Sequence, residues 1–225
     1  MSHAEHAVWQ QERRRAVTGA TGNLALVETR WGAVDPAAAL DGQPSTVTAT
    51  TLKRRDPMTG NDQHGVRLWD ADSPAIRHFE RIETYDYDPA WVVEARYTDV
   101  DDARKVPFQH AQDAGFTRDL PVPGDLHLSL GGRDYTLSAF DDDGTLLLVF
   151  GDPTNGVDTY GSGRFLFVER APGQVTVTLD FNRAFVPPCG FSSHYNCPLP
   201  PPQNRLALPV HAGEKRPVFQ PGFDH

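Results

Sequence analysis

The chain has 225 residues and a formal net charge of -9 at pH 7, with 39% hydrophobic and 23% charged residues. This length allows one large domain or two small ones, each with a sizeable core. No apolar run approaches the roughly 18 to 20 residues that span a bilayer, and no apolar stretch near the N-terminus resembles a secretory signal. Without such segments, we expect a soluble cytoplasmic protein. Because an acidic chain repels polyphosphates, we also expect it to bind neither nucleic acid nor membranes.

The N-terminus carries the one strong helix pattern of the sequence. Ser2 and Glu5 have the spacing of a capping box, and Gly19 stands where a helix end is expected. We therefore predict a helix within residues 1–20, packed on the outside of a β-rich body.

The first half of the remaining chain consists of short apolar runs between turn residues, which is a pattern typical of β-strands. Strands are predicted at 24–31, 46–52, 66–69 and 91–97. Asp35-Pro36 predicts a turn or a single helical turn, and 54–65 predicts a hairpin-like connection.

The second half contains a clear hairpin pattern. Apolar residues alternate over 126–130 and again over 135–139, on either side of Gly131-Gly132. The unbroken apolar run at 146–150 predicts a central strand that is buried on both faces.

Two more strands, at 165–168 and 175–181, flank the Pro172-Gly173 turn, and we expect them to form a second hairpin.

Nine of the 19 prolines lie between Pro187 and Pro221, a density that excludes a helix or a central strand. We expect this segment to be an ordered strap over residues 186–217. The full prediction is a mainly β protein with two packed antiparallel sheets or a partly open β-barrel. One β-rich domain is expected over residues 21–225, with the helix of residues 1–20 packed on it.

The stretch from Gly151 to Arg164 is rich in glycine and presents a set of polar side chains: Asp152, Thr154, Asp158, Thr159, Tyr160 and Arg164. Arg164 could bind a carboxylate or phosphate as a fork, and Asp152 could act as an acceptor or base. The spacing is not that of a P-loop. The alternative is a well-packed hairpin in which Arg164 forms a buried ion pair with Asp152 or Asp180.

Asp180 and Asn182 lie on one face of the last predicted strand, with Phe181 on the other. The two polar side chains either face a cleft, or Asn182 caps the turn into Ala184.

Cys189 and Cys197 are the only cysteines, with His194 between them and His211 as a conceivable fourth ligand. Three interpretations remain open: reduced thiols packed as small hydrophobes, a disulfide, or a metal site, for which this spacing is a weak signal. Ser162 lies in a Gly-Ser-Gly sequence without the strand-to-helix elbow of a serine hydrolase.

The last third of the chain resembles a prokaryotic family of uncharacterised proteins, domain of unknown function family 1684. The resemblance is carried by Gly151-Asp152, Thr154, Gly156, Thr159-Tyr160, Gly163-Arg164, Asp180-Phe181-Asn182, Pro188-Cys189, Cys197-Pro198, Asn204-Arg205-Leu206 and Ala212-Gly213-Glu214-Lys215. It extends more loosely over most of the chain. The resemblance implies one fold and the location of a site, and brings no established reaction with it.

The sequence favours a small-molecule-binding protein or enzyme whose polar pocket takes a small anionic or hydroxylated ligand. Catalytic candidates are Asp152, Tyr160 and Asp180, and binding candidates are Thr154, Thr159, Tyr160, Arg164, Asn182, Asn204, Glu214 and Lys215. One alternative is a structural or interaction module in which these groups lock the strap. Another is a thiol or metal protein. No motif requires a cofactor, and the sequence decides neither catalysis nor oligomeric state.

Overall fold

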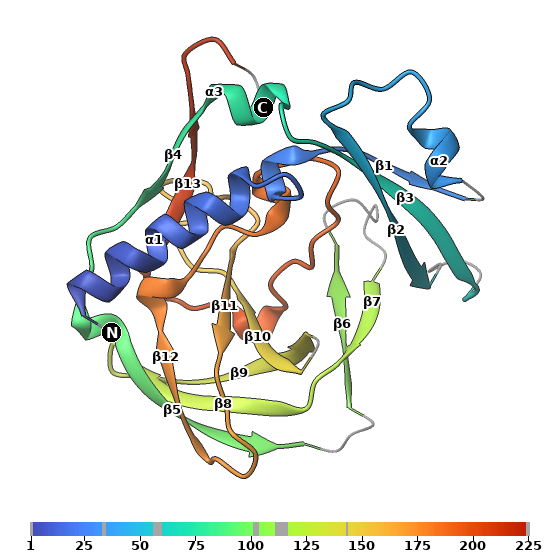
Figure 1. Cartoon of the computed structure of the whole chain (residues 1–225). Coiled ribbons are helices and arrows are strands. Elements are labelled where there is room, and N and C mark those ends of the chain that lie inside the picture. The colour runs from blue at the N-terminus through green and yellow to red at the C-terminus, as the bar shows by residue number, and fades with distance from the viewer. Residues whose placement is uncertain are drawn as a thin grey trace. The chain divides into compact units, whose positions relative to one another are not determined.

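A computed structural model describes residues 2–32, 35–55, 60–100, 104–110, 117–142 and 144–223 (Figure 1). Antiparallel strands dominate, so the predicted mainly β class is confirmed. The α-helices are α1 (His3–Thr18), α2 (Pro36–Ala39) and α3 (Pro74–His78). The strands are β1 (Leu26–Trp31), β2 (Val47–Arg55), β3 (Asp62–Asp70), β4 (Phe79–Thr84), β5 (Val92–Asp99), β6 (Lys105–Gln109), β7 (Thr117–Pro121), β8 (Gly124–Leu130), β9 (Arg133–Asp142), β10 (Thr145–Phe150), β11 (Arg164–Val168), β12 (Thr176–Asp180) and β13 (Glu214–Phe219). Short 3-10 helices are η1 (Asn23–Ala25), η2 (Pro89–Trp91), η3 (Phe181–Arg183), η4 (Pro188–Gly190) and η5 (Pro202–Asn204).

The chain divides into two compact units. The first, called the barrel unit below, comprises Met1–Val8, Glu83–Pro187 and Cys197–Arg216. The second comprises Trp9–Ile82, Pro188–Asn196 and Pro217–His225. The boundary between the two units falls within helix α1, after Val8. It does not coincide with the expected boundary between residues 20 and 21. The expectation of one folding domain over residues 21–225 stays a prediction.

The barrel unit is built on a six-stranded antiparallel sheet with the order β11-β10-β9-β8-β5-β12 (Figure 1). The sheet curls into a partly open barrel whose two edge strands are β11 and β12. Leucine, valine and phenylalanine side chains from its strands fill the interior, because alternate residues of each strand point inward. Core residues with at most 1% exposure include Leu126, Leu137, Leu148, Phe150, Leu166, Val177, Leu179 and Phe181.

Several local predictions are confirmed in this sheet. Strands β8 and β9 form the predicted hairpin, with Leu130 opposite Arg133 and positive φ angles of 60° and 75° at Gly131 and Gly132. Strand β10 lies between β9 and β11, and its residues from Leu146 to Phe150 are all buried. Two-residue turns with positive φ match the twist of the strands they join, and glycine adopts such φ angles readily. The Gly-Gly pair between two alternating runs therefore predicts this hairpin.

The predicted hairpin between residues 165–168 and 175–181 is wrong. Strand β11 pairs with β10, and β12 pairs with β5 at the other edge of the sheet. Alternating side chains predict a strand, but the strand's partner depends on which neighbour completes its backbone hydrogen bonds. The result is an open side of the barrel between β11 and β12, where an isolated bridge joins Phe165 to Phe185.

The second unit contains the antiparallel sheet β1-β3-β2. Strands β2 and β3 form the predicted hairpin, paired from Val47 with Asp70 to Arg55 with Asp62; residues 56–59 of the connection lie outside the described residues. Strand β1 begins at Leu26, two residues later than predicted, because residues 23–25 form η1. The single helical turn predicted at Asp35-Pro36 is α2, which Asp35 Oδ1 caps by accepting from the Ala37 amide at 3.0 Å.

Helix α1 confirms the predicted capping box. The Ser2 amide donates to Glu5 Oε2 at 2.6 Å, and the Glu5 amide donates to Ser2 Oγ at 3.3 Å. These two bonds satisfy amides that have no partner within the helix. In the part of the chain that the structure describes, no helix is both long and apolar enough to cross a lipid bilayer.

Candidate functional site

Arg164, the first residue of β11, lies at the centre of the polar residues that the sequence singled out. Its side chain is 0% exposed. Nη2 donates to Asp152 Oδ2 at 2.8 Å and to the Val210 carbonyl at 2.8 Å, and Nη1 donates to the Ala212 carbonyl. The guanidinium carbon lies 5.3 Å from the centre of the Phe150 ring. Arg164 is therefore an interior cation held by one carboxylate and the backbone of the strap.

Asp152 joins the glycine-rich loop to the strap. One oxygen faces Arg164, and the other accepts from the Thr154 amide at 2.9 Å and the Val210 amide at 3.2 Å. The side chain is buried, so these donors replace the water that an exposed carboxylate would bind. Asp152, Arg164 and the strap carbonyls of Val210 and Ala212 are called the strap lock below.

Two of the predicted ligand-binding hydroxyls, those of Thr154 and Thr159, form hydrogen bonds within the loop itself. Thr154 Oγ1 and Thr159 Oγ1 share a hydrogen bond of 2.9 Å, and Asn155 Nδ2 also donates to Thr159 Oγ1 at 2.9 Å. Tyr160 is half-buried, and its amide donates to the Lys215 carbonyl at 2.8 Å. The loop and the end of the strap thus lie together, as the sequence led us to expect.

Asn204 anchors the middle of the strap on the barrel. It is fully buried; its Oδ1 accepts from the Ser138 amide, and its Nδ2 donates to the carbonyls of Ser138 and Val149, each at 2.8 Å. Glu214 is buried as well, and its Oε2 accepts from the Val186 amide at 2.8 Å. Both side chains therefore satisfy backbone groups of the fold.

Gly213 lets the strap pass close to the backbone after Phe181. Its φ is +78°, and a Cβ there would lie 2.4 Å from the Ala184 carbonyl oxygen. Only glycine combines this conformation with so close an approach. The turn at Gly213 directly follows the Ala212 carbonyl that binds Arg164.

Within the described residues, Asp180 and Asn182 make no hydrogen bond to the strap lock. Asp180 Oδ1 accepts from the Asn182 amide at 3.1 Å and from Asn182 Nδ2 at 2.9 Å, so Asp180, and not Asn182, caps the turn that follows β12. Asn182 is fully buried and exchanges two hydrogen bonds with the backbone of Asp88, at 2.9 and 3.0 Å. The ion pair considered between Arg164 and Asp180 is not formed; the partner of Arg164 is Asp152.

His6, in the first turns of α1, packs on this region. Its ring is buried, its Nε2 lies 3.2 Å from the Asn182 carbonyl, and burial lowers the pKa of His6 below its usual range. Because the unfolded chain binds the proton more readily, His6 stabilises the fold above about pH 6.5, and this contribution is lost as the pH falls through the folded pKa.

We expect His6→Gln, which keeps a donor for the Asn182 carbonyl but cannot titrate, to weaken the loss of thermal stability between about pH 7 and pH 5. Melting curves across this range measure the effect, with the exposed His64→Gln as the matched control. Equal pH slopes for wild type and His6→Gln would contradict the assignment.

Tyr85 belongs to the surroundings of the strap lock but carries no motif that the sequence could reveal. Its hydroxyl donates to Asp158 Oδ2 at 3.1 Å, and Lys215 Nζ lies 4.5 Å from the centre of its ring. Burial, and then the hydrogen bond to Asp158, raise the pKa of Tyr85 to about 12. The Lys215 ammonium also pairs with Glu83 at 3.8 Å, so these groups form a mutually satisfied cluster.

The cysteines are thiols and not a disulfide, with Cys189 half-buried and Cys197 buried. Among the described residues, no three His, Cys, Asp or Glu side chains come together in a way that could hold a metal ion. The metal ligands considered from the sequence, Cys189, His194, Cys197 and His211, therefore make no metal centre in this structure.

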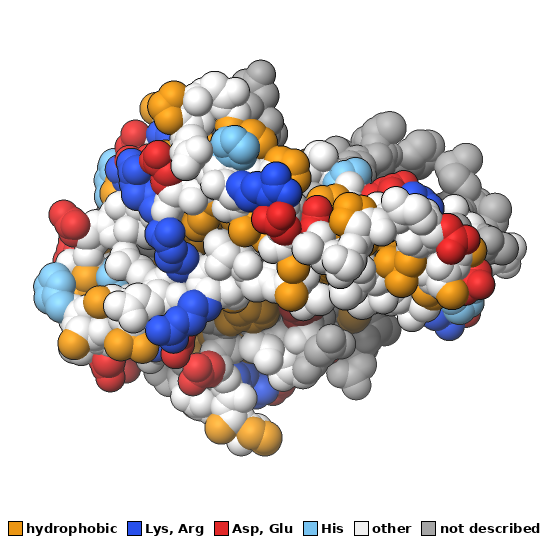
Figure 2. Space-filling model, turned by 45° about the horizontal axis from the view of Figure 1, so that its top comes forward, with side chains coloured by type: hydrophobic (Ala, Val, Ile, Leu, Met, Phe, Trp, Pro, Cys, Tyr) orange, Lys and Arg blue, Asp and Glu red, His pale blue; other side chains and the backbone are white. Residues whose placement is uncertain are grey.

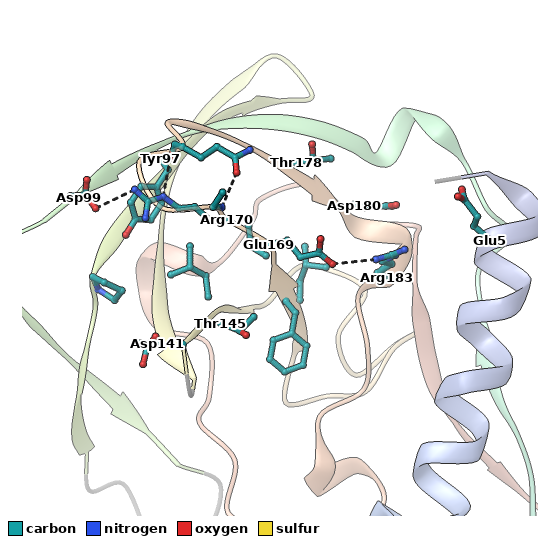
Figure 3. Close-up of a pocket in the computed structure, with 18 residues that line it drawn as sticks. Glu5, Tyr97, Asp99, Asp141, Thr145, Glu169, Arg170, Thr178, Asp180 and Arg183 are labelled. Carbon is teal, nitrogen blue, oxygen red and sulfur yellow. Dashed lines mark hydrogen bonds and ion pairs between the residues drawn. The ribbon is translucent and has the colours of Figure 1, made fainter.

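A pocket of about 980 Å³ lies elsewhere in the barrel unit, along the open side between β11 and β12 (Figure 3). We call it the seam pocket. Its lining residues come from both edge strands and their connection, from the β9–β10 hairpin, from β5, from the residue before β8, from η3 and from α1: Glu5, Tyr97, Asp99, Pro123, Asp141, Gly144, Thr145, Leu146, Leu166, Phe167, Val168, Glu169, Arg170, Ala171, Gln174, Thr178, Asp180 and Arg183. Of the site residues predicted from the sequence, Asp180 alone is among them.

The seam pocket has an apolar floor and a charged wall. Leu146, Leu166 and Val168 are core residues that reach it from the barrel interior. The rest of the lining includes five carboxylates (Glu5, Asp99, Asp141, Glu169 and Asp180) and two guanidiniums (Arg170 and Arg183). Each guanidinium already faces a carboxylate, at 3.4 Å for Arg170 with Asp99 and 4.0 Å for Arg183 with Glu169. The pocket is therefore acidic overall.

The chain belongs to the family described as protein of unknown function, DUF1684, whose model matches residues 77–215. This confirms the family resemblance seen in the sequence. The chain is also similar to an uncharacterised protein of Haloarcula marismortui with a solution NMR structure. The two are 33% identical over 61% of this chain and 77% of that chain, with a TM-score of 0.50. No curated protein matches the sequence.

The matched region includes the complete strap lock and all six strands of the barrel sheet. Helix α1 and the sheet β1-β3-β2 lie outside it. The family match therefore refers to the barrel unit and its strap.

Proposed function

We propose that this chain binds a small polar molecule in the seam pocket. The observation that carries the proposal is the pocket itself: about 980 Å³, with an apolar floor and convergent polar groups. Known small-molecule sites have volumes of roughly 300 to 1,000 Å³ and combine an apolar lining with a few placed polar groups. Pockets in the mouths of β-barrels are a common location for such sites.

The charge of the wall narrows the ligand class. A polyanion would meet five carboxylates against two guanidiniums, each of which already lies within 4.0 Å of one of these carboxylates. Of the anionic or hydroxylated ligands expected from the sequence, the pocket thus favours a molecule that is not a polyanion and that offers hydrogen-bond donors. Carboxylates and the hydroxyls of Thr145 and Thr178 accept from such donors.

The strap lock supports a second role, the structural module considered above. Arg164 and Asp152 are both 0% exposed in their side chains and bond to each other and to the strap, with only Arg164 Nε of the pair left without a partner among the described residues. A fully buried pair of this kind positions chain segments and exposes no donor to a ligand. In the proposal it holds the strap on the barrel, while the ligand binds at the seam pocket.

The proposal places the protein in the cytoplasm and includes no nucleic-acid or membrane partner. On the face shown in Figure 2, Lys and Arg side chains lie among Asp and Glu side chains and do not form one basic patch. Together with the net charge of -9, this distribution opposes binding to a polyphosphate backbone.

A thermal-shift screen tests the proposed function. A library of neutral polyols, amines, amino acids and anions should contain a compound that raises the melting temperature by roughly 5 to 10 °C at about 100 times its dissociation constant. Thr178→Trp fills the seam pocket from β12 and should abolish this shift. Thr176→Trp, exposed on the same face of the same strand but outside the pocket, is the matched control. A shift that survives Thr178→Trp would place the ligand elsewhere.

A further inference from the structure

Arg170 holds a defined position at one end of the seam pocket. It lies in the connection between β11 and β12, and its side chain is 18% exposed. The guanidinium carbon is 3.8 Å from the centre of the Tyr97 ring, and Nε donates to the Gln174 carbonyl at 2.9 Å (Figure 3). Stacking on the ring and this one bond fix the orientation of the planar fork.

The fork has more donors than the protein satisfies. Nη2 reaches Asp99 Oδ1 only at 3.4 Å, and the Asp99 side chain is 79% exposed, so solvent screens this pair. Within the described part of the chain, Nη1 makes no hydrogen bond. A mostly buried guanidinium with one good hydrogen bond has room for a bidentate acceptor, and a carboxylate is the acceptor that fits the fork best.

Whereas Arg170 has donors that the protein leaves unused, several carboxylates of the pocket belong to no ion pair. Asp141, Asp180 and Glu5 take part in no ion pair within the described residues, whereas Glu169 faces Arg183. Figure 3 shows Glu5 at the end of the pocket opposite Arg170, with Asp180 toward the same end. One end of the pocket therefore presents a cation with unused donors, and the remainder presents four carboxylates against one cation, Arg183.

Building on the proposed function, we propose that the ligand is a small zwitterion. Its carboxylate binds the Arg170 fork, and its ammonium group faces the carboxylates of Asp180 and Glu5 toward the opposite end (Figure 3). A ligand with both groups fills the unused donors of Arg170 with its carboxylate and offsets the excess of carboxylates with its ammonium group. A simple amine leaves the donors of Arg170 unused, and a simple carboxylate is repelled by the acidic wall.

A matched series of probes tests this inference by isothermal titration calorimetry. The probes are ω-amino acids from glycine to 6-aminohexanoate, each compared with the amine and the carboxylate of the same chain length. At the length that spans the two ends, the zwitterion should bind about tenfold tighter or more than either single-charge analogue, as expected for a charge-assisted hydrogen-bonded pair. The series of lengths samples a range of distances between the carboxylate and the ammonium group.

Variants of Arg170 identify the anchor. Arg170→Gln should reduce zwitterion binding to the level of the matching amine and leave amine binding unchanged. Arg170→Lys keeps the charge but lacks the fork, and should also bind the zwitterion more weakly than wild type does. Arg96→Gln removes the same charge from an exposed position of β5 outside the pocket, and should bind the zwitterion as wild type does. Melting temperatures confirm that each variant is folded.

The outcomes separate this inference from the proposed function. Equal affinity for the zwitterion and the amine at every length, or no binding by any member of the series, overturns the zwitterion. If a different library compound then shows a thermal shift that Thr178→Trp abolishes, the proposed function stands. If no compound does, the proposed function fails as well.

Discussion

Arg164→Ala is expected to lower the free energy of unfolding by about 3 to 5 kcal/mol, because it leaves the Asp152 carboxylate buried without its cation. It also removes the donors to the carbonyls of Val210 and Ala212. Urea unfolding of wild type and variant measures the difference. Arg205→Ala removes an exposed strap arginine and is the matched control, with an expected loss of less than about 0.5 kcal/mol.

A second substitution tests the ion pair itself. Replacing both partners, as in Arg164→Met with Asp152→Leu, removes both buried charges and should recover part of the lost stability. The recovery should be partial, because Asp152 also accepts from the amides of Thr154 and Val210. If Arg164→Ala costs less than about 1 kcal/mol, the strap lock does not stabilise the fold as inferred here.

Asn204→Ala is expected to cost about 3 kcal/mol, because three buried backbone groups lose their partners at once. These groups are the amide and carbonyl of Ser138 and the carbonyl of Val149. Denaturant unfolding measures the total loss, and hydrogen exchange should show reduced protection of the Ser138 amide. The neighbouring Gln203→Ala, at an exposed position, removes only a 3.4 Å contact from Gln203 Nε2 to Ser138 Oγ and should change neither quantity. Unchanged exchange at Ser138 in Asn204→Ala would contradict the anchoring role.

Substitutions in the strap contacts and substitutions in the seam pocket should have different effects on stability and binding. Arg164 and Asn204 hold the strap, so their loss should reduce stability and affect binding only through the fold. Thr178 and Arg170 line the seam pocket, so their replacement should change binding more than stability. Such a separation of stability from binding is the expected signature of a lock and a ligand site that are distinct.

The sequence by itself determined the features that depend on neighbouring residues. The capping box of α1, the single turn of α2, the β8–β9 hairpin and the buried strand β10 all follow from spacing within about ten residues. Caps and tight turns are closed by local hydrogen bonds, and alternation reports which side of a strand is apolar. The mainly β class and the family follow from the same local patterns.

Only the tertiary structure decided which polar side chains form ion pairs and hydrogen bonds with one another. Asp152 and Asp180 were equivalent candidates for Arg164 in the sequence, and only the packing of the strap selects Asp152. Glycine-rich loops with polar side chains suit a ligand site and a buried lock equally well, since both require hydrogen-bond donors, acceptors and close backbone approach. The sequence therefore leaves both interpretations of the loop open, and in the structure Asp152, Thr154 and Thr159 form hydrogen bonds within the protein.

The seam pocket could not be predicted from the sequence, because its lining residues are far apart along the chain. Its lining runs from Glu5 to Arg183, and no local pattern links those positions. The pocket exists because β11 pairs with β10 and β12 pairs with β5, which leaves one side of the barrel open. Strand pairing is chosen by hydrogen-bond completion across the whole sheet, so a hairpin pattern in the sequence could not reveal that these two strands would separate.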